Sequence, residues 1–101
     1  RLGQNYTVEL SHHYGIESFR EVGATIFNII NREYCKKIIV MLPGQKHPIH
    51  RHMKKEETFH ILNGSMTVSL DDVSHNLSEG DLLLVERGAW HGMNSEAGVV
   101  F

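Results

Sequence analysis

Eight histidines stand in a chain of 101 residues, and three of them are spaced so that they could hold a metal ion. His50 and His52 are separated by one residue in a segment expected to be extended. Alternate side chains of a strand point to the same face, so these two imidazoles form a natural chelating pair. His91, beside Trp90 on a distant expected strand, would add a third imidazole. The spacing therefore predicts a histidine-based metal site.

Glu57 is the candidate carboxylate of the same site. It shares an expected strand face with Phe59 and Ile61, which are apolar and should point inward. A carboxylate without a partner is very costly in an apolar interior, and a metal held by the histidines would supply that partner. Glu56 competes for this role, but strand alternation sends its side chain to the opposite face. We therefore predict Glu57 as the oxygen ligand.

Three neutral imidazoles and one carboxylate make a mixed nitrogen and oxygen donor set. This set suits one divalent transition metal (Zn, Fe, Mn, Ni or Cu) rather than Ca, and it does not choose among the five. The open coordination positions of such a site can polarise a carbonyl or hydroxyl oxygen, or hold a chelating small molecule. No pair of residues has the acid–base spacing that would name a reaction, so the catalytic residues and enzyme status stay open.

The same residues fall in a known pattern. Gly44, His50, His52, Glu57 and Gly64 occupy every fixed position of the first cupin motif. The chain therefore resembles the cupin superfamily, and in particular its small single-domain metal-binding members, over about residues 40–94. The 15 residues between the first motif and the second are typical of compact microbial cupins.

The second cupin motif matches less completely. Gly80, Gly88 and His91 are in place, but the usual proline is Glu86 and the usual asparagine is Ser95. Neither departure touches a metal ligand. Glu86 leaves the local turn in doubt, because proline fixes φ and glutamate does not.

The resemblance implies an all-β fold, the double-stranded β-helix or cupin jelly-roll barrel, with four ligands inside it: His50, His52, Glu57 and His91. It does not imply one activity, since the family spans dioxygenases, isomerases, epimerases, decarboxylases, storage proteins and sensor domains.

The elements expected to position these residues are short strands over residues 6–10, 25–30, 35–42, 57–62, 65–70, 73–77, 81–86, 90–94 and 98–101. Their number and their spacing near ten residues favour a sandwich or barrel. Asn63-Gly64 is a favoured hairpin dipeptide, so strands 57–62 and 65–70 should pair through it. Residues 15–21 should form a short helical turn. A helix at 25–30 in a mixed α+β domain is the alternative.

The other histidines are predicted to have solvated roles. His47 should lie in an exposed rim loop, and His60 should point away from the interior. His12, His13 and His75 fall in turns or on outer faces. Candidate ligand-binding residues near the opening are Lys46, Tyr34, Arg51 and Trp90, with Glu86 as a further candidate.

Composition excludes several classes of protein function. The formal net charge is −2, so no basic excess exists to hold nucleic acid, and no apolar run approaches the length of a membrane span. The single cysteine, Cys35, excludes a disulfide within the chain and is typical of a reducing, cytoplasmic location. At this length we expect one cupin domain over residues 1–101, and the ends suggest a module excised from a longer polypeptide.

A second resemblance concerns residues 8–15, 31–37 and 43–57, which look like the cupin modules fused to sialic-acid (N-acetylneuraminate) synthase-like enzymes. It implies an accessory module that binds a sugar or related small metabolite through its metal. Two alternatives remain open. One is a stand-alone metal-dependent enzyme, first a sugar isomerase or epimerase and then an Fe(II) dioxygenase. The other is a structural, dimerising β-barrel. A homodimer is expected in any case, because exposed strand edges invite pairing.

Overall fold

The computed structural model describes residues 7–101, which form ten strands and one short 3₁₀ turn. Tyr6, at the start of the first expected strand, lies outside the described residues. The elements in chain order are β1 (Thr7–His12), η1 (Ile16–Ser18), β2 (Gly23–Asn31), β3 (Cys35–Met41), β4 (Lys46–His50), β5 (Glu57–His60), β6 (Asn63–Leu70), β7 (Val73–Ser78), β8 (Leu82–Val85), β9 (His91–Asn94) and β10 (Val99–Val100). The all-β prediction, with a helical turn near the N-terminus, is confirmed.

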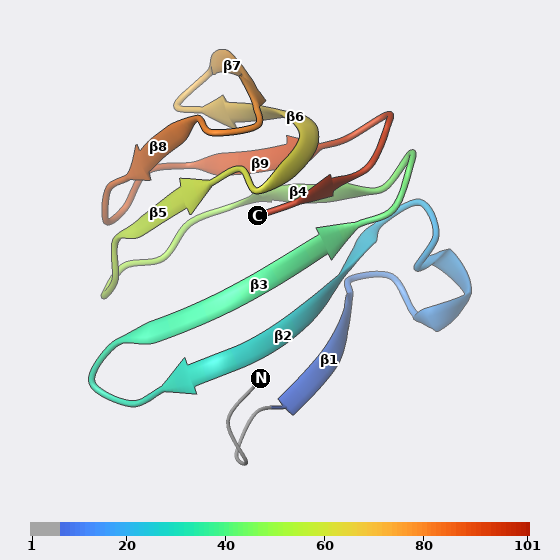
Figure 1. Cartoon of the computed structure of the whole chain (residues 1–101), viewed down its shortest axis with the longest axis horizontal. Helices are drawn as coiled ribbons and strands as arrows, with labels where there is room; N and C mark the ends of the chain where they lie inside the picture. The colour runs from blue at the N-terminus through green and yellow to red at the C-terminus, as the bar shows by residue number, and fades with distance from the viewer. Residues whose placement is uncertain (1–6) are drawn as a thin grey trace.

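Eight strands make one long antiparallel sheet in the order β1-β2-β3-β10-β6-β9-β4, with β7 paired to β6. The other two, β5 and β8, pair with each other in a separate small sheet. The long sheet curls, so that β3 and β5 lie on opposite sides of the interior of the molecule (Figure 1). The result is a half-barrel whose inner face receives side chains from strands that are far apart in sequence.

The predicted hairpin through Asn63-Gly64 is wrong. These two residues belong to β6, and β5 pairs with β8 instead of with β6. Gly64 lies opposite Val99 of β10, and a Cβ on it would overlap the carbonyl oxygen of Gly98. Its φ of +82° also favours glycine. The dipeptide therefore serves a close approach of two backbones, which has the same sequence signature as a turn.

The segment with the helical alternative is a strand, β2, which pairs with both β1 and β3. Its β-branched residues and its position between two partners explain the outcome. The Asp71–Asp72 turn between β6 and β7 has φ values of 45° and 67°, which match a tight hairpin turn. No helix among the described residues is long and apolar enough to cross a membrane.

The core lies between the curled sheet and the β5–β8 pair. Its buried hydrophobic residues come from nearly every strand: Ala24, Met41, Phe59, Ile61, Met66, Val68, Leu77, Val85, Met93, Val99 and Phe101. Three polar residues are also buried among the described residues, namely Gln45, His91 and Ser95. Gln45 Nε2 donates to the carbonyl of Phe19 at 2.6 Å, and its Oε1 accepts from the backbone amide of Leu42 at 2.8 Å. Gln45 thus ties the segment after η1 to the start of β4.

Candidate metal centre

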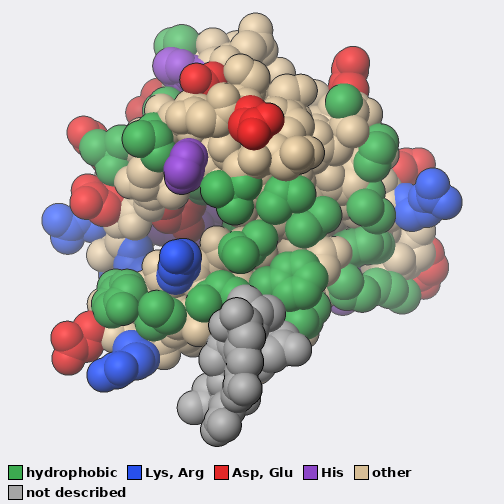
Figure 2. Space-filling model, in the orientation of Figure 1, with side chains coloured by type: hydrophobic (Ala, Val, Ile, Leu, Met, Phe, Trp, Pro, Cys, Tyr) green, Lys and Arg blue, Asp and Glu red, His purple; other side chains and the backbone are tan. Residues whose placement is uncertain are grey.

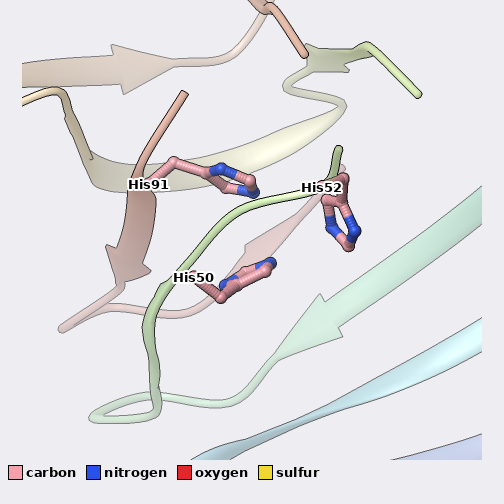
Figure 3. Close-up of side chains that lie close together, drawn as sticks. All are labelled: His50, His52 and His91. Carbon is pink, nitrogen blue, oxygen red and sulfur yellow. The ribbon is translucent and has the colours of Figure 1, made fainter. Parts of the chain in front are cut away.

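Two of the predicted ligands meet because their strands are paired. His50 ends β4 and His91 begins β9, and the two residues are directly opposed in the antiparallel register. The ring centroids are 4.2 Å apart. His91 is 1% exposed, and His50 is partly buried. Residues that are 41 positions apart in the chain are therefore neighbours on the inner face of the barrel (Figure 3).

His52 completes the cluster from a different position than the sequence predicted. It lies beyond the end of β4, in the connection to β5, and not on the same strand as His50. The backbone amide of Gly88 donates to the His52 carbonyl at 2.8 Å, which holds this connection against the turn before β9. One ring nitrogen from each of His50, His52 and His91 lies within 4.8 Å of the other two. Figure 3 shows the three rings directed toward a common space.

Glu57, the first residue of β5, faces the same space. Its Oε1 lies 3.2 Å from His52 Nε2, and its Oε2 lies 3.6 Å from His91 Nε2. Phe59, two residues further along, is 6% exposed, so the inward face expected for this strand is observed. The carboxylate raises the pKa of His91, and His91 in turn lowers the pKa of Glu57. In the metal-free protein both pKa directions favour a negative Glu57 beside a protonated His91, and a metal cation bound to His91 Nε2 would take the place of that proton.

Backbone carbonyls orient two of the rings. Nδ1 of His50 lies 2.9 Å from the Pro48 carbonyl oxygen, and Nδ1 of His91 lies 3.0 Å from the Ala89 carbonyl oxygen. A carbonyl can only accept, so each Nδ1 carries the proton and donates it. Burial also lowers the pKa of His50, which favours its neutral form. In the neutral form each ring therefore presents the lone pair of Nε2, which is the form that binds a metal.

The residues fit a divalent transition metal on this geometry. His91 Nε2 is buried and has no hydrogen-bond partner among the described residues, since the 3.6 Å separation from Glu57 exceeds hydrogen-bond distance. A buried nitrogen without a partner costs about 1–3 kcal/mol. A metal bound to that lone pair would remove this cost. Three imidazole nitrogens beside one carboxylate also form a donor set for such an ion rather than for Ca²⁺.

A cavity of about 890 Å³ opens from the histidine cluster. Of the predicted ligand-binding residues, Tyr34 and Arg51 line it, whereas Lys46 and Trp90 do not. Lys46 is exposed on β4, and its amide donates to the Glu21 carbonyl at 2.9 Å. Trp90 is 49% exposed, and the centroid of its ring lies 4.5 Å from the guanidinium carbon of Arg51. Ligand contact by Tyr34 and Arg51 stays a prediction.

Glu86 stands where the second cupin motif usually has proline, and the sequence left the turn at this position in doubt. The Ala89 amide donates to the Glu86 carbonyl at 3.1 Å, and Gly88 takes a φ of 79°. The turn before β9 therefore forms without proline, because glycine supplies the conformation that it needs. Glu86 is exposed and does not line the cavity.

His47 is the residue that the sequence reasoning misplaced. It belongs to β4, is partly buried and lines the cavity, whereas an exposed rim loop was predicted. The register of β4 against β9 shifts between His47 and His50, so both side chains reach the inner face although they are three residues apart. Burial lowers the pKa of His47 to about 4. Its Nε2 lies 3.1 Å from Nε2 of His13, which is exposed as predicted.

The cavity also receives residues that were not singled out, chiefly Cys35 and Lys37 of β3. Strand alternation from the buried Met41 backward could have identified them, since every second residue from 35 to 41 faces inward. The remaining histidines keep the predicted positions in part. His12 is exposed as predicted, and His75 is partly buried on β7. His60 is exposed, but it also lines the cavity, whereas it was predicted to point away from the interior.

Comparison with known proteins identifies the family of this domain. A family model described as "Cupin domain" matches residues 37–100. Protein SchB from Streptomyces halstedii is 34% identical over 68 residues, which are 63% of this chain and 49% of that protein. This chain thus spans about half the length of the curated relative that it matches.

Solved structures agree on the fold. An RmlC-like cupin from Shewanella frigidimarina NCIMB 400 has a TM-score of 0.74 at 21% identity, covering 93% of this chain and 78% of that one. The Cnp3 cupin domain of Schizosaccharomyces pombe has a TM-score of 0.70 at 16% identity, covering 76% of this chain and 59% of that one. At these identities the likeness establishes the fold alone.

Proposed function

This chain belongs to the cupin family, and from that premise we propose that it binds one divalent transition metal ion and holds a small metabolite beside it. The ligands of the proposed site are His50, His52, Glu57 and His91. The observation that carries the proposal is His91 Nε2, which is buried, oriented by the Ala89 carbonyl and without a hydrogen-bond partner among the described residues. When bound, the metal would supply Lewis-acid polarisation of a ligand oxygen.

The cavity supports the second half of the proposal. Its volume of about 890 Å³ falls in the range of small-molecule sites. Apolar residues such as Ile39 and Phe101 form one wall, and polar side chains such as Tyr34 and Arg51 stand on another. This combination suits a metabolite with an oxygen-rich part and an apolar face, and a sugar or sugar derivative has both. We propose a carbohydrate-related ligand on these grounds.

The resemblance to modules of sialic-acid synthase-like enzymes extends the proposal. Under it, the domain would bind a sugar on behalf of a synthase encoded in the same polypeptide, as a homodimer in the cytoplasm. Support for pairing comes from β1, an edge strand whose Val8 and Leu10 are 51% and 49% exposed. Light scattering of the purified protein measures the oligomeric state, and the full coding sequence shows whether a synthase segment is attached. A monomer would contradict the proposed homodimer. A coding sequence without a synthase segment would contradict the proposed attachment to a synthase.

Metal analysis tests the site directly. Protein purified without nickel chromatography should contain one metal ion per chain by elemental analysis after dialysis against a metal mixture. The double variant His50→Ala/His52→Ala should contain almost none. The control His12→Ala/His75→Ala removes two histidines that belong neither to the cluster nor to the cavity lining, and it should keep the full metal content. Equal metal in both double variants would show that the ligand assignment is wrong.

Probe binding tests the metabolite. The probe is N-acetylneuraminate, added to the metal-loaded protein. The amide NMR signals of Tyr34 and Ile39 should shift on its addition. Residues on the outer face, such as Ser74 of β7, should not respond. Signal changes confined to outer residues would contradict a ligand in this cavity.

A further inference from the structure

The cavity beside the histidine cluster has an apolar wall and a cationic rim. Inward residues of the curled sheet form the wall: Ala24, Ile26, Ile39, Met41, Met93 and Phe101. Figure 2 shows hydrophobic side chains gathered over the middle of this face of the molecule, with Lys and Arg side chains at its left-hand end beside a hollow. The apolar wall and the cationic rim meet where the cavity opens to solvent, and we call this opening the mouth. A ligand in this cavity therefore contacts apolar atoms at one side and positive charge at the other.

Strand alternation explains why one lysine belongs to the cavity and its neighbour does not. Cys35, Lys37, Ile39 and Met41 line the cavity, whereas Lys36 does not. Successive side chains of a strand point to opposite faces, so β3 sends Lys37 to the mouth and Lys36 to the outside. Both lysines are exposed, so neither is needed for the core. The chain thus contains its own matched pair for a test.

The connection between β4 and β5 adds three more cations to the lining of the cavity: Arg51, Lys54 and Lys55. Lys55 Nζ donates to Cys35 Sγ at 3.4 Å, so this connection contacts the beginning of β3 across the mouth. No ion pair among residues 7–101 involves Lys37 or any of these three cations. Arg51 stacks on the Trp90 ring and Lys55 contacts Cys35, but no carboxylate among the described residues neutralises any of the four charges, so all four can act on a ligand.

The acidic residues around the cavity are fewer. They are Glu33, Glu56 and Glu57, and Glu57 already contacts His52 and His91. The cavity thus has an excess of positive charge, although the chain as a whole has a net charge of −2. A concave surface concentrates such a field and raises the local concentration of a ligand of the opposite sign.

We propose that the cavity takes a small anionic metabolite, whose carboxylate or phosphate is held at the mouth by Lys37 and the cations of the β4–β5 connection while its apolar part lies against the sheet. The proposal deepens the function proposed above and rests on it only in using the same cavity. Among the sugars and sugar derivatives proposed above, it favours an anionic derivative over a neutral sugar. Charge-assisted hydrogen bonds to an oxygen anion supply the selectivity.

The test uses three probes that share an aromatic body: 3-phenylpropionate, its neutral amide and phenyl phosphate. Their dissociation constants are measured by NMR titration of the full chain, both loaded with Zn²⁺ and treated with chelator. In both forms the preferred anion should bind at least about tenfold more tightly than the amide, and the comparison of the two anions identifies carboxylate or phosphate. Equal affinity of both anions and the amide, or no binding of either anion, overturns the proposal.

Two variants localise the effect. Lys37→Gln should weaken binding of the preferred anion about tenfold and leave the amide unchanged, and Lys36→Gln should change neither. Equal effects of the two variants overturn the role of Lys37. The chelator-treated arm separates this inference from the metal proposal, because the preference for an anion there does not depend on a metal. A protein that fails to take up Zn²⁺ but still prefers the anion refutes only the metal site, and a protein that binds Zn²⁺ but does not prefer the anion refutes only this inference.

Discussion

Gly64→Ala tests how closely β10 must approach β6 for the barrel to close. Gly64 is paired with Val99, and its φ is +82°. An added Cβ would overlap the Gly98 carbonyl oxygen and lie 3.1 Å from the Val99 Cα. Both contacts are backbone atoms, so no side-chain rotation can relieve them. Substitution must therefore displace β10, which leads directly to the buried Phe101.

The expected loss of stability in Gly64→Ala follows from a comparison with Gly80→Ala. Gly80 has a similar φ of +90°, but a Cβ there would meet nothing within 4 Å. Both variants bear the strain of a left-handed alanine, about 1–2 kcal/mol. Gly64→Ala also weakens the backbone hydrogen bonds beside it, such as that from the Leu62 amide to the Val100 carbonyl at 2.8 Å. Two such bonds contribute about 1 kcal/mol each to the free energy of unfolding. With the backbone strain added, Gly64→Ala should lower the free energy of unfolding by roughly 3–4 kcal/mol, and Gly80→Ala should lower it by about 1–2 kcal/mol.

Urea unfolding of both variants and the unsubstituted chain, all treated with chelator, measures this difference. The denaturant dependence of the free energy should be the same for the three proteins, because the substitutions change one contact and not the size of the fold. A difference below about 0.5 kcal/mol between Gly64→Ala and Gly80→Ala would refute the reasoning. It would show that β10 can move away from β6 at little cost.

Three further predictions concern the core and the site. Met41→Ala should cost about 2–5 kcal/mol in urea unfolding, because the side chain is 1% exposed, whereas Met53→Ala, at 64% exposed, should cost less than about 0.5 kcal/mol; similar losses would contradict the described core. Gln45→Leu should cost about 2–4 kcal/mol in the same assay, because it leaves two backbone groups without their hydrogen-bond partner, and an unchanged midpoint would show that these bonds contribute nothing. Zn²⁺ at a hundredfold excess over its Kd should raise the Tm of chelator-treated protein by roughly 10 °C or more in calorimetry, and His91→Ala should abolish most of that rise; a variant that keeps the full rise would exclude His91 as a ligand.

Much of the site was predictable from residue types and spacing. His50, His52 and His91 do converge, and Glu57 faces them from the strand that carries Phe59. The reason is that a buried carboxylate and a set of imidazoles need one another, so their types and positions are tightly constrained. The position of His52 was only half right. It reaches the cluster from a connection outside β4, whose path is set by the amide of Gly88.

His47 shows what spacing cannot reveal. Strict alternation cannot place both His47 and His50 on one face, because they are three residues apart. The register shift in β4 does so, and such a shift depends on how the partner strand β9 meets it. The same holds for Asn63-Gly64, where the dipeptide predicts a hairpin and the contact with Gly98 explains the glycine.

The sequence by itself determined the all-β class, most strand positions and the four candidate ligands, because these depend on local alternation, turn residues and the chemistry of donor groups. Only the tertiary structure decided which strands pair, that β5 meets β8, and which lysine of β3 faces the cavity mouth. Pairing is decided by backbone groups of distant segments competing for the same hydrogen bonds, and no local pattern records that competition. The charge of the cavity follows from that pairing, since it arises from residues of β3 and of the β4–β5 connection that meet only in the folded chain.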